Sequence, residues 1–116
     1  PGQTYSRNIR VTRIVDTFLE HARIWYFGNG GNPKLFLGSP DWMRRNLYRR
    51  IEAVTPILDP DAKQELIDML SIQLSDKRKA CFVDENLRNC WKSAHPQKEK
   101  VRSQYTFYEY LKEKTE

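Results

Sequence analysis

Long hydrophobic runs are absent from this sequence of 116 residues, and their absence excludes a class of proteins. No uninterrupted apolar segment approaches the roughly 20 residues of a membrane-spanning helix. The first fifteen residues are polar and basic, so we expect no secretory signal peptide. An initiator methionine is also lacking, and the chain runs almost at once into strand-like sequence. We therefore expect a piece of a longer protein, which could hold only half of a site.

Cysteine and histidine are scarce, with two residues of each. Cys81 and Cys90 have neither the spacing of zinc ligands nor the density of a disulfide-stabilised fold. Isolated thiols fit a reducing cytoplasm, which is where we expect the protein, and no metal site is predicted in the chain. His95 stands in a polar stretch between Ala94 and Pro96, and we expect it to be solvated and without a role.

The sequence does contain enough apolar residues for one modest core. Hydrophobic residues make up 39% of the chain and aromatic residues 12%, which is too many for a disordered segment. The length is typical of one small domain, so residues 1–116 are predicted to form a single domain.

Basic residues are concentrated in the first part of the chain. Residues 1–50 carry nine basic and three acidic side chains, whereas residues 51–116 carry eleven and twelve. The first part has eight arginines and one lysine, and the second has three arginines and eight lysines. The planar guanidinium can hold phosphate or carboxylate with two parallel hydrogen bonds. The first part is therefore suited to a polyanion, although arginines scattered along strand faces explain the composition equally well.

Helical and strand patterns alternate along the chain, which predicts an α+β (mixed α/β) fold with a small mixed sheet packed by helices. The expected strands cover 8–15, 22–27, 34–37, 49–55 and 79–83, the last of these being the final strand. The expected helices cover 42–48, a Leu-rich stretch opened by Asp59-Pro60, and 100–113, and residues 84–98 are expected to be irregular. Ser39 is predicted to cap the first helix, with Asp41 favoured by the helix dipole.

Gly28-Asn29-Gly30-Gly31 raises the question of a nucleotide-binding loop. The third glycine of G-x-G-x-x-G is missing, and the segment leads into a strand rather than a helix. A hairpin turn explains it better.

His21 is the best single candidate for chemistry. It precedes the expected strand 22–27, and residues two apart in a strand share a face, so His21 and Arg23 are predicted to point the same way. An imidazole can exchange a proton near neutral pH, while a guanidinium neutralises charge on a phosphate. The alternative is a structural histidine at a strand end.

Two long motifs resemble the C-terminal catalytic region of bacterial polyphosphate kinase, the family that makes inorganic polyphosphate from ATP. Residues 8–31, NIRVTRIVDTFLEHARIWYFGNGG, carry the first motif, and residues 37–52, LGSPDWMRRNLYRRIE, carry the second. The resemblance continues through PILDP at 56–60 and KVRSQ at 100–104, so it covers essentially the whole chain. Tyr48 stands where that family commonly has aspartate, and Pro40 where alanine is usual.

The resemblance implies a phospholipase-D-like half-domain that contributes one of two histidines to a shared site. His21 would be the histidine that faces the phosphorylated one and touches the nucleotide phosphates. Arg23 and Arg50 are the phosphate contacts that we expect, and Ser39, Asp41 and Asn46 are expected to support the site. The wider phospholipase D pattern H-x-K-x4-D is only partly matched, because Arg23 replaces the lysine and Gly28 stands at the aspartate position.

The implied reaction is reversible transfer of the terminal phosphoryl group of ATP to polyphosphate through a phosphohistidine outside these residues. ATP or ADP and polyphosphate would be the ligands, with Mg²⁺ held by residues outside this chain, and the isolated piece would be inactive. The resemblance also implies contact with the rest of its own polypeptide, homo-oligomerisation, peripheral association with the inner membrane, and no nucleic-acid partner. Two alternatives remain: an arginine-rich nucleic-acid-binding module and half of a phospholipase-D-like nuclease.

Overall fold

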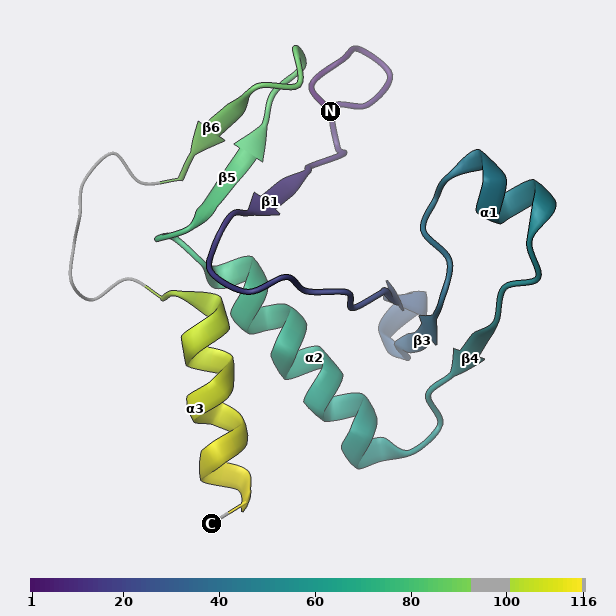
Figure 1. Ribbon diagram of the computed structural model, residues 1–116, viewed down its shortest axis with the longest axis vertical. Helices are drawn as coiled ribbons and strands as arrows, with labels where there is room; N and C mark the ends of the chain where they lie inside the picture. Colours follow the sequence, from purple (N-terminus) through teal and green to yellow (C-terminus); the bar gives the residue numbers. More distant parts are fainter. Residues whose placement is uncertain (93–100, 116) are drawn as a thin grey trace. The chain divides into compact units, whose positions relative to one another are not determined.

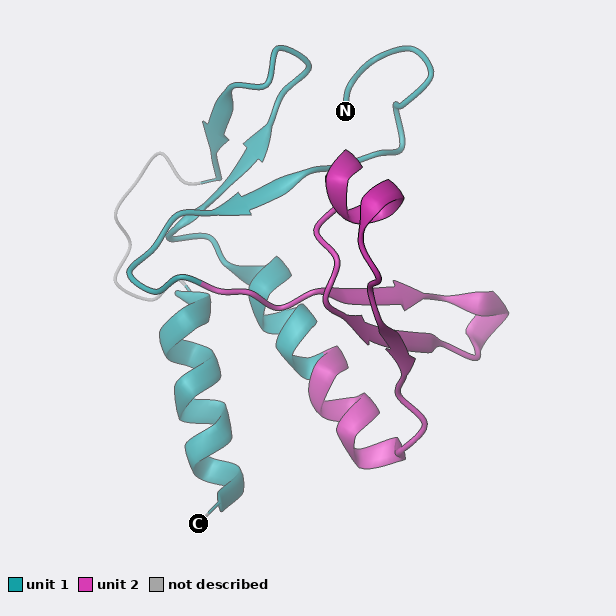
Figure 2. Cartoon of the chain, turned by 45° about the vertical axis from the view of Figure 1, so that its right-hand side comes forward, with its two compact units in different colours: residues 1–19, 68–116 teal, residues 20–67 magenta. Residues whose placement is uncertain are grey.

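The computed structural model describes residues 1–92 and 101–115 (Figure 1). Two three-stranded antiparallel sheets and three α-helices make up the regular structure of these residues, which confirms the predicted α+β class. The expected small mixed sheet is therefore two antiparallel sheets. The chain divides into two compact units, residues 1–19 with 68–116 and residues 20–67 (Figure 2). No helix in the described part of the chain is both long and apolar enough to cross a membrane.

Unit 1, residues 1–19 and 68–116, holds one sheet and two helical segments. Its strands are β1 (Thr12–Ile14), β5 (Ala80–Val83) and β6 (Asn89–Trp91), in the order β1-β5-β6. The central strand β5 supplies Ala80, Cys81 and Val83 to the core, as its apolar sequence requires. The helices are the second half of α2 (Pro60–Ser75) and α3 (Ser103–Thr115).

A buried carboxylate, Asp76, joins three segments of unit 1. Its Oδ1 accepts hydrogen bonds from the backbone N–H groups of Arg78, Lys79 and Ala80, and its Oδ2 accepts one from that of Ser103 at 2.7 Å. Burial alone would raise the pKa of Asp76, but the N–H donors, with those of Ser103 and Lys79 foremost, lower the pKa below its ordinary value. Asp76 thereby fixes the end of α2, the start of β5 and the start of α3.

A second connection in unit 1 links the loop after β1 to α3. Asp16 accepts a bidentate pair from Arg102, with Nη2 to Oδ1 at 2.6 Å and Nε to Oδ2 at 2.8 Å. The side-chain amide of Gln104 exchanges two hydrogen bonds with the backbone of Phe18, at 2.7 and 2.9 Å. These polar contacts hold the two segments together where each side chain lies partly or wholly out of solvent.

Unit 2, residues 20–67, contains the second sheet and the expected candidate residues. Its strands are β2 (Ile24–Phe27), β3 (Lys34–Gly38) and β4 (Val54–Pro56), with β3 central, and α1 (Arg44–Arg49) lies between β3 and β4. The β2–β3 pairing, which matches Phe27 with Lys34, confirms the hairpin predicted at the glycine-rich segment. A short 3₁₀ turn, η1 (Asn29–Gly31), closes it, and the positive φ of Gly30 and Gly31 explains why glycine stands there.

Gly38, the last residue of β3, allows two side chains to pack closely. An added Cβ at this position would lie 2.6 Å from Cζ3 of Trp25 and 2.9 Å from Cγ2 of Val54. Gly38 pairs with Val54 across the sheet. Only glycine leaves room for the Trp25 ring at this point.

Several predicted boundaries are wrong. The helix expected at 42–48 begins at Arg44, Ser39 does not cap it, and Asp41 precedes it by three residues. The strand expected at 49–55 is reduced to β4, because Arg49 still belongs to α1, and that expected at 8–15 is only β1. β6 lies in the stretch expected to be irregular, so β5 is not the final strand. His95 lies outside the described residues.

Candidate functional site

His21 is exposed and lies three residues before β2. The prediction that His21 and Arg23 share a strand face is therefore wrong in its premise, because neither residue belongs to the strand. The two residues are nevertheless joined, since Nη1 of Arg23 donates a hydrogen bond to the backbone oxygen of His21 at 3.1 Å. This contact holds the backbone of His21 and leaves its imidazole open to solvent.

The guanidinium of Arg23 is engaged on a second side. Its Nε donates to Oδ1 of Asp41 at 2.8 Å, forming an ion pair between side chains that are 27% and 53% exposed. The hydrogen bond from Arg23 lowers the pKa of Asp41, and nearby His21 and Arg45 act in the same direction. Arg23 thus connects the His21 segment to the loop before α1, and Asp41 remains a carboxylate near neutral pH.

Asn46 is the buried residue of α1, at 4% exposure. Its Nδ2 donates to the backbone oxygen of Asp41 at 3.2 Å, which fixes the loop that carries the Asp41 carboxylate. Its Oδ1 is buried and has no hydrogen-bond partner among the described residues. Asn46 therefore supports the position of Asp41, and through it that of Arg23.

Ser39 forms a polar contact that the sequence did not predict. Its Oγ donates to Oε2 of Glu52 at 2.5 Å and accepts the backbone N–H of Ala53 at 3.3 Å. Its own N–H donates to the Ala53 oxygen at 3.0 Å, so Ser39 extends the pairing of β3 with β4. Glu52 also contributes, after Asp41, to raising the pKa of Arg23. Glu52 was not among the predicted site residues, although it ends the second long motif.

Five of the six predicted site residues thus fall within one group of contacts. His21, Arg23, Asp41 and Asn46 are linked by hydrogen bonds, and Ser39 joins them through the charge of Glu52. Arg50 is exposed and follows α1 in extended conformation, and no hydrogen bond or ion pair among the described residues joins it to this group.

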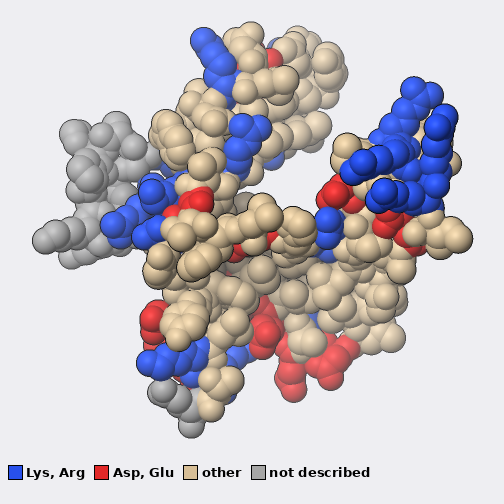
Figure 3. Space-filling view, in the orientation of Figure 1, with Lys and Arg blue, Asp and Glu red and all other residues tan. Residues whose placement is uncertain are grey.

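A cluster of basic residues lies on α1, and none of its members is among the predicted site residues. Arg44, Arg45 and Arg49 line a surface depression of about 420 Å³ together with Tyr48. Figure 3 shows the basic side chains gathered over α1. We call this set the α1 arginine face.

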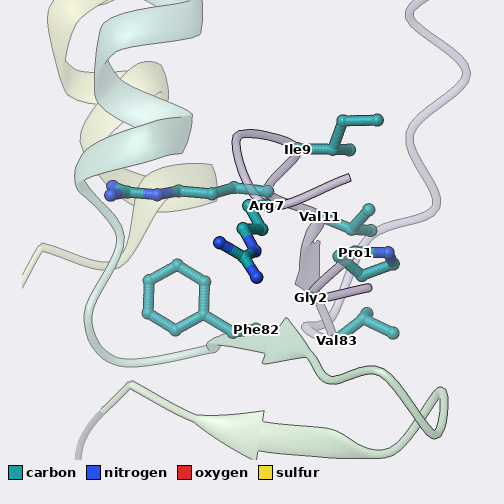
Figure 4. A pocket seen from close by; sticks show the side chains of 8 residues that line it. Pro1, Gly2, Arg7, Ile9, Val11, Phe82 and Val83 are labelled. Atoms are coloured by element: carbon teal, nitrogen blue, oxygen red, sulfur yellow. The ribbon is translucent and has the colours of Figure 1, made fainter. Parts of the chain in front are cut away.

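A further depression, of about 450 Å³, lies in unit 1 beside β1 and β5. Figure 4 shows Pro1, Ile9, Val11 and Val83 along one side of it and the Phe82 ring on the other. Arg7 and Arg10 are its charged lining residues. No set of three or more His, Cys, Asp or Glu side chains gathers there, or elsewhere in the described chain, to hold a metal ion.

Residues 1–104 match the family model described as polyphosphate kinase C-terminal domain 2. The chain is similar to polyphosphate kinase of Escherichia coli K12, with 46% identity over 92% of the chain, and to that of Vibrio vulnificus YJ016, with 44% over 97%. It spans only 15% and 16% of their lengths.

A solved structure gives the same result for the fold. The crystal structure of polyphosphate kinase from Porphyromonas gingivalis matches 98% of the chain with a TM-score of 0.91 and 53% identity. The chain corresponds to 17% of that protein.

Proposed function

The chain belongs to the polyphosphate kinase family as a C-terminal domain, and from this premise we propose that it is part of an ATP:polyphosphate phosphotransferase. The proposed reaction breaks the bond between the β–γ bridging oxygen and the γ-phosphorus of ATP, and a histidine nitrogen takes the phosphoryl group. The terminal oxygen of polyphosphate then takes the group from that histidine. Both steps run in either direction. We place the phosphorylated histidine outside these 116 residues.

We assign to His21 the role of facing the transferred phosphoryl group as a ligand or proton donor. The observation that carries this assignment is that His21 presents an open imidazole while its backbone is held by Arg23. Phosphoryl transfer depends mainly on positioning and on neutralising charge. An exposed imidazole on a restrained backbone suits that task.

Arg23 and Asp41 position His21, and neither takes over the role that we assign to His21. The Nε and Nη1 groups of Arg23 are used by Asp41 and by the His21 backbone. Its remaining N–H groups are left to contact a phosphate oxygen, as the sequence suggested. Asn46 and Ser39 keep the Asp41 loop and the β3–β4 connection in place. We retain Arg50 as a phosphate contact in the complete enzyme.

The remaining ligands and partners are proposed on the same premise. ATP or ADP and inorganic polyphosphate are the substrates, and Mg²⁺ supplies charge neutralisation at the nucleotide phosphates from ligands elsewhere in the polypeptide. The rest of its own polypeptide completes the site. We place the enzyme in the cytoplasm as a homo-oligomer with peripheral association with the inner membrane, and without a nucleic-acid partner.

The deciding experiment measures ATP-dependent polyphosphate synthesis by the natural polypeptide that contains these residues. His21→Ala is expected to lower kcat by roughly 100- to 10,000-fold without changing the thermal midpoint. The matched control is His95→Ala, the same substitution at the other histidine, which should retain activity. A His21→Ala protein that loses stability but keeps its specific activity would show a structural histidine. Equal binding of RNA and polyphosphate at equal charge would favour the nucleic-acid alternative.

A further inference from the structure

None of the hydrogen bonds that link the described residues around His21 involves the α1 arginine face. Three of the six residues of α1 are arginines, and the helix has no acidic residue in its first turn. Among the described residues, the guanidiniums of Arg44, Arg45 and Arg49 form no ion pair, whereas those of Arg23, Arg88 and Arg102 each do. In the described part of the chain, the face is therefore a concentration of positive charge in which no arginine is ion-paired with a carboxylate.

Most of this charge does not stabilise the helix, because only Arg49 stands in the last turn, where the helix dipole favours a cation. Arg44 and Arg45 stand in the first turn, where the positive end of the helix dipole disfavours cations. Arg45 and Arg49 are four residues apart, so their like charges repel along one side of the helix. A helix of six residues has little intrinsic stability, so these unfavourable charges are significant for it. Such unfavourable placement is expected where the charges bind an anion.

We propose that the α1 arginine face is a docking surface for the polyphosphate chain, away from its reacting end. The inference rests on the proposed function, and it adds a binding surface that lies outside the His21 contacts. Guanidinium groups match phosphate oxygens in pairs, and a linear polyphosphate presents a phosphate at every unit. The surface therefore holds successive phosphates of one chain.

The lining favours polyphosphate over single-stranded nucleic acid. Surfaces that bind single strands combine positive charge with several aromatic rings on which bases stack. The depression on α1 is lined by three guanidiniums and by the single ring of Tyr48. Positive charge therefore predominates over aromatic surface in this depression, which suits polyphosphate because polyphosphate has no bases to stack.

The test compares two charge-matched double variants of the natural polypeptide. Arg44→Gln with Arg49→Gln removes two charges from the face and spares Arg45, which lies near enough to Asp41 to affect its pKa. Lys77→Gln with Arg78→Gln removes two charges from exposed positions in unit 1. Affinity for long-chain polyphosphate is measured across a salt series, together with the KM for ATP and the binding of single-stranded RNA.

The variant on the face should lose about tenfold in affinity for long-chain polyphosphate. The slope of log affinity against log salt should fall by about 1.4, as expected for two lost phosphate contacts. The control should keep both values, and the KM for ATP should be unchanged in each variant. Unchanged polyphosphate affinity, an equal loss in the control, or a loss confined to RNA would overturn the inference.

These outcomes separate the inference from the proposed function. If the unmodified enzyme makes polyphosphate and the variant on the face behaves identically, the docking surface is refuted and the proposed function stands. If the unmodified enzyme neither makes nor binds polyphosphate, the proposed function fails and the inference fails with it.

Discussion

The Nε of Arg23 lies 2.8 Å from Oδ1 of Asp41, a residue 18 positions further along the chain. The same guanidinium donates to the backbone oxygen of His21. A single side chain therefore sets the position of the His21 backbone relative to the loop before α1. This relationship makes Arg23 a positioning residue as well as a candidate phosphate ligand.

Arg23→Gln and Asp41→Asn should each lower kcat for polyphosphate synthesis by about 10- to 100-fold, because either change releases the His21 backbone. Neither should change the thermal midpoint appreciably, since exposed ion pairs contribute little to stability. Because the two side chains act as a unit, the double variant should be no slower than the slower single variant.

Steady-state kinetics of the unmodified enzyme, the two single variants and the double variant separate the positioning role of Arg23 from a role in phosphate binding. If Arg23 only positions His21, Arg23→Lys should fail to restore kcat, because an ammonium cannot donate in two fixed directions. Rates that multiply in the double variant would contradict coupling through the ion pair. A rise in KM alone, with kcat unchanged, would point to phosphate binding instead.

The isolated 116-residue chain should show no ATP-dependent polyphosphate synthesis, because we place the phosphorylated histidine outside it. An NMR titration with magnesium-ATP, and then with short polyphosphate, would show whether this part of the site binds phosphate by itself. Shifts are expected at His21 and Arg23 and should persist at near-physiological salt. Circular dichroism confirms the fold beforehand, and measurable turnover would contradict the proposed division of the site.

Asp76→Asn should destabilise the chain at neutral pH by about 2 kcal/mol, because the amide cannot accept all four backbone hydrogen bonds. The pKa of Asp76 is lowered in the folded state, so its stabilising contribution is complete above the unfolded value near 3.8 and is lost as the pH falls through the folded value. The difference from the unmodified chain should therefore be constant above about pH 5 and shrink below it.

Urea denaturation across this pH range measures the effect. The pKa values of Asp16, Asp41 and Asp84 are also lowered, so the Asp76→Asn variant should still lose stability as the pH falls. The decrease in its free energy of unfolding should be smaller than that of the unmodified chain. Asp61→Asn is the control, since Asp61 is exposed and stands in the first turn of α2. A constant difference between Asp76→Asn and the unmodified chain down to pH 2 would contradict the ionised state of Asp76.

Gly38→Ala should destabilise the chain by about 1–3 kcal/mol, because the new methyl group overlaps the Trp25 ring. Gly28→Ala is the matched control. Gly28 has an ordinary φ of −63° and nothing within 4 Å of an added Cβ, so alanine there should be neutral or slightly stabilising. Equal free energies of unfolding for the two variants would refute the close packing at Gly38.

Local signals explain which elements could be predicted. The helix opened by Asp59-Pro60 is α2, and Oδ1 of Asp59 accepts the N–H of Ala62 at 2.8 Å, as an N-terminal cap should. The turn between β2 and β3 was predictable from its glycines. In both places, neighbours in sequence make the decisive contacts.

The predictions of secondary structure were wrong where contacts between residues distant in sequence determine the local structure. Ser39 has the local sequence of a helix cap, but its hydroxyl is taken by Glu52 and Ala53 across the β3–β4 pairing. All three residues of β6 are exposed, so the strand has no alternation of burial, and it forms only because it pairs with β5. Asp84 closes that hairpin by accepting the N–H groups of Asn86 and Arg88.

The contacts among the candidate site residues could not be predicted from the sequence. The two motifs contain His21, Arg23 and Asp41, but strand periodicity paired only His21 with Arg23, and neither of these two residues lies in β2. The contact of Arg23 with Asp41 was not predicted. The connection through Arg23 needs the β2–β3 hairpin to bring the loop after β3 beside the segment before β2. Arg50 belongs to the second motif, as Asp41 does, but no hydrogen bond or ion pair among the described residues joins Arg50 to this group.

The four hydrogen bonds to Asp76 have a consequence for how unit 1 opens. The amides of Arg78, Lys79, Ala80 and Ser103 share one acceptor residue, although Ser103 is 27 positions away from it in sequence. If the Asp76 carboxylate moves away, all four N–H groups lose their hydrogen-bond acceptor at the same time. Their amide protons should therefore exchange with deuterated solvent as one cooperative set, which makes the start of α3 and the start of β5 a single opening unit.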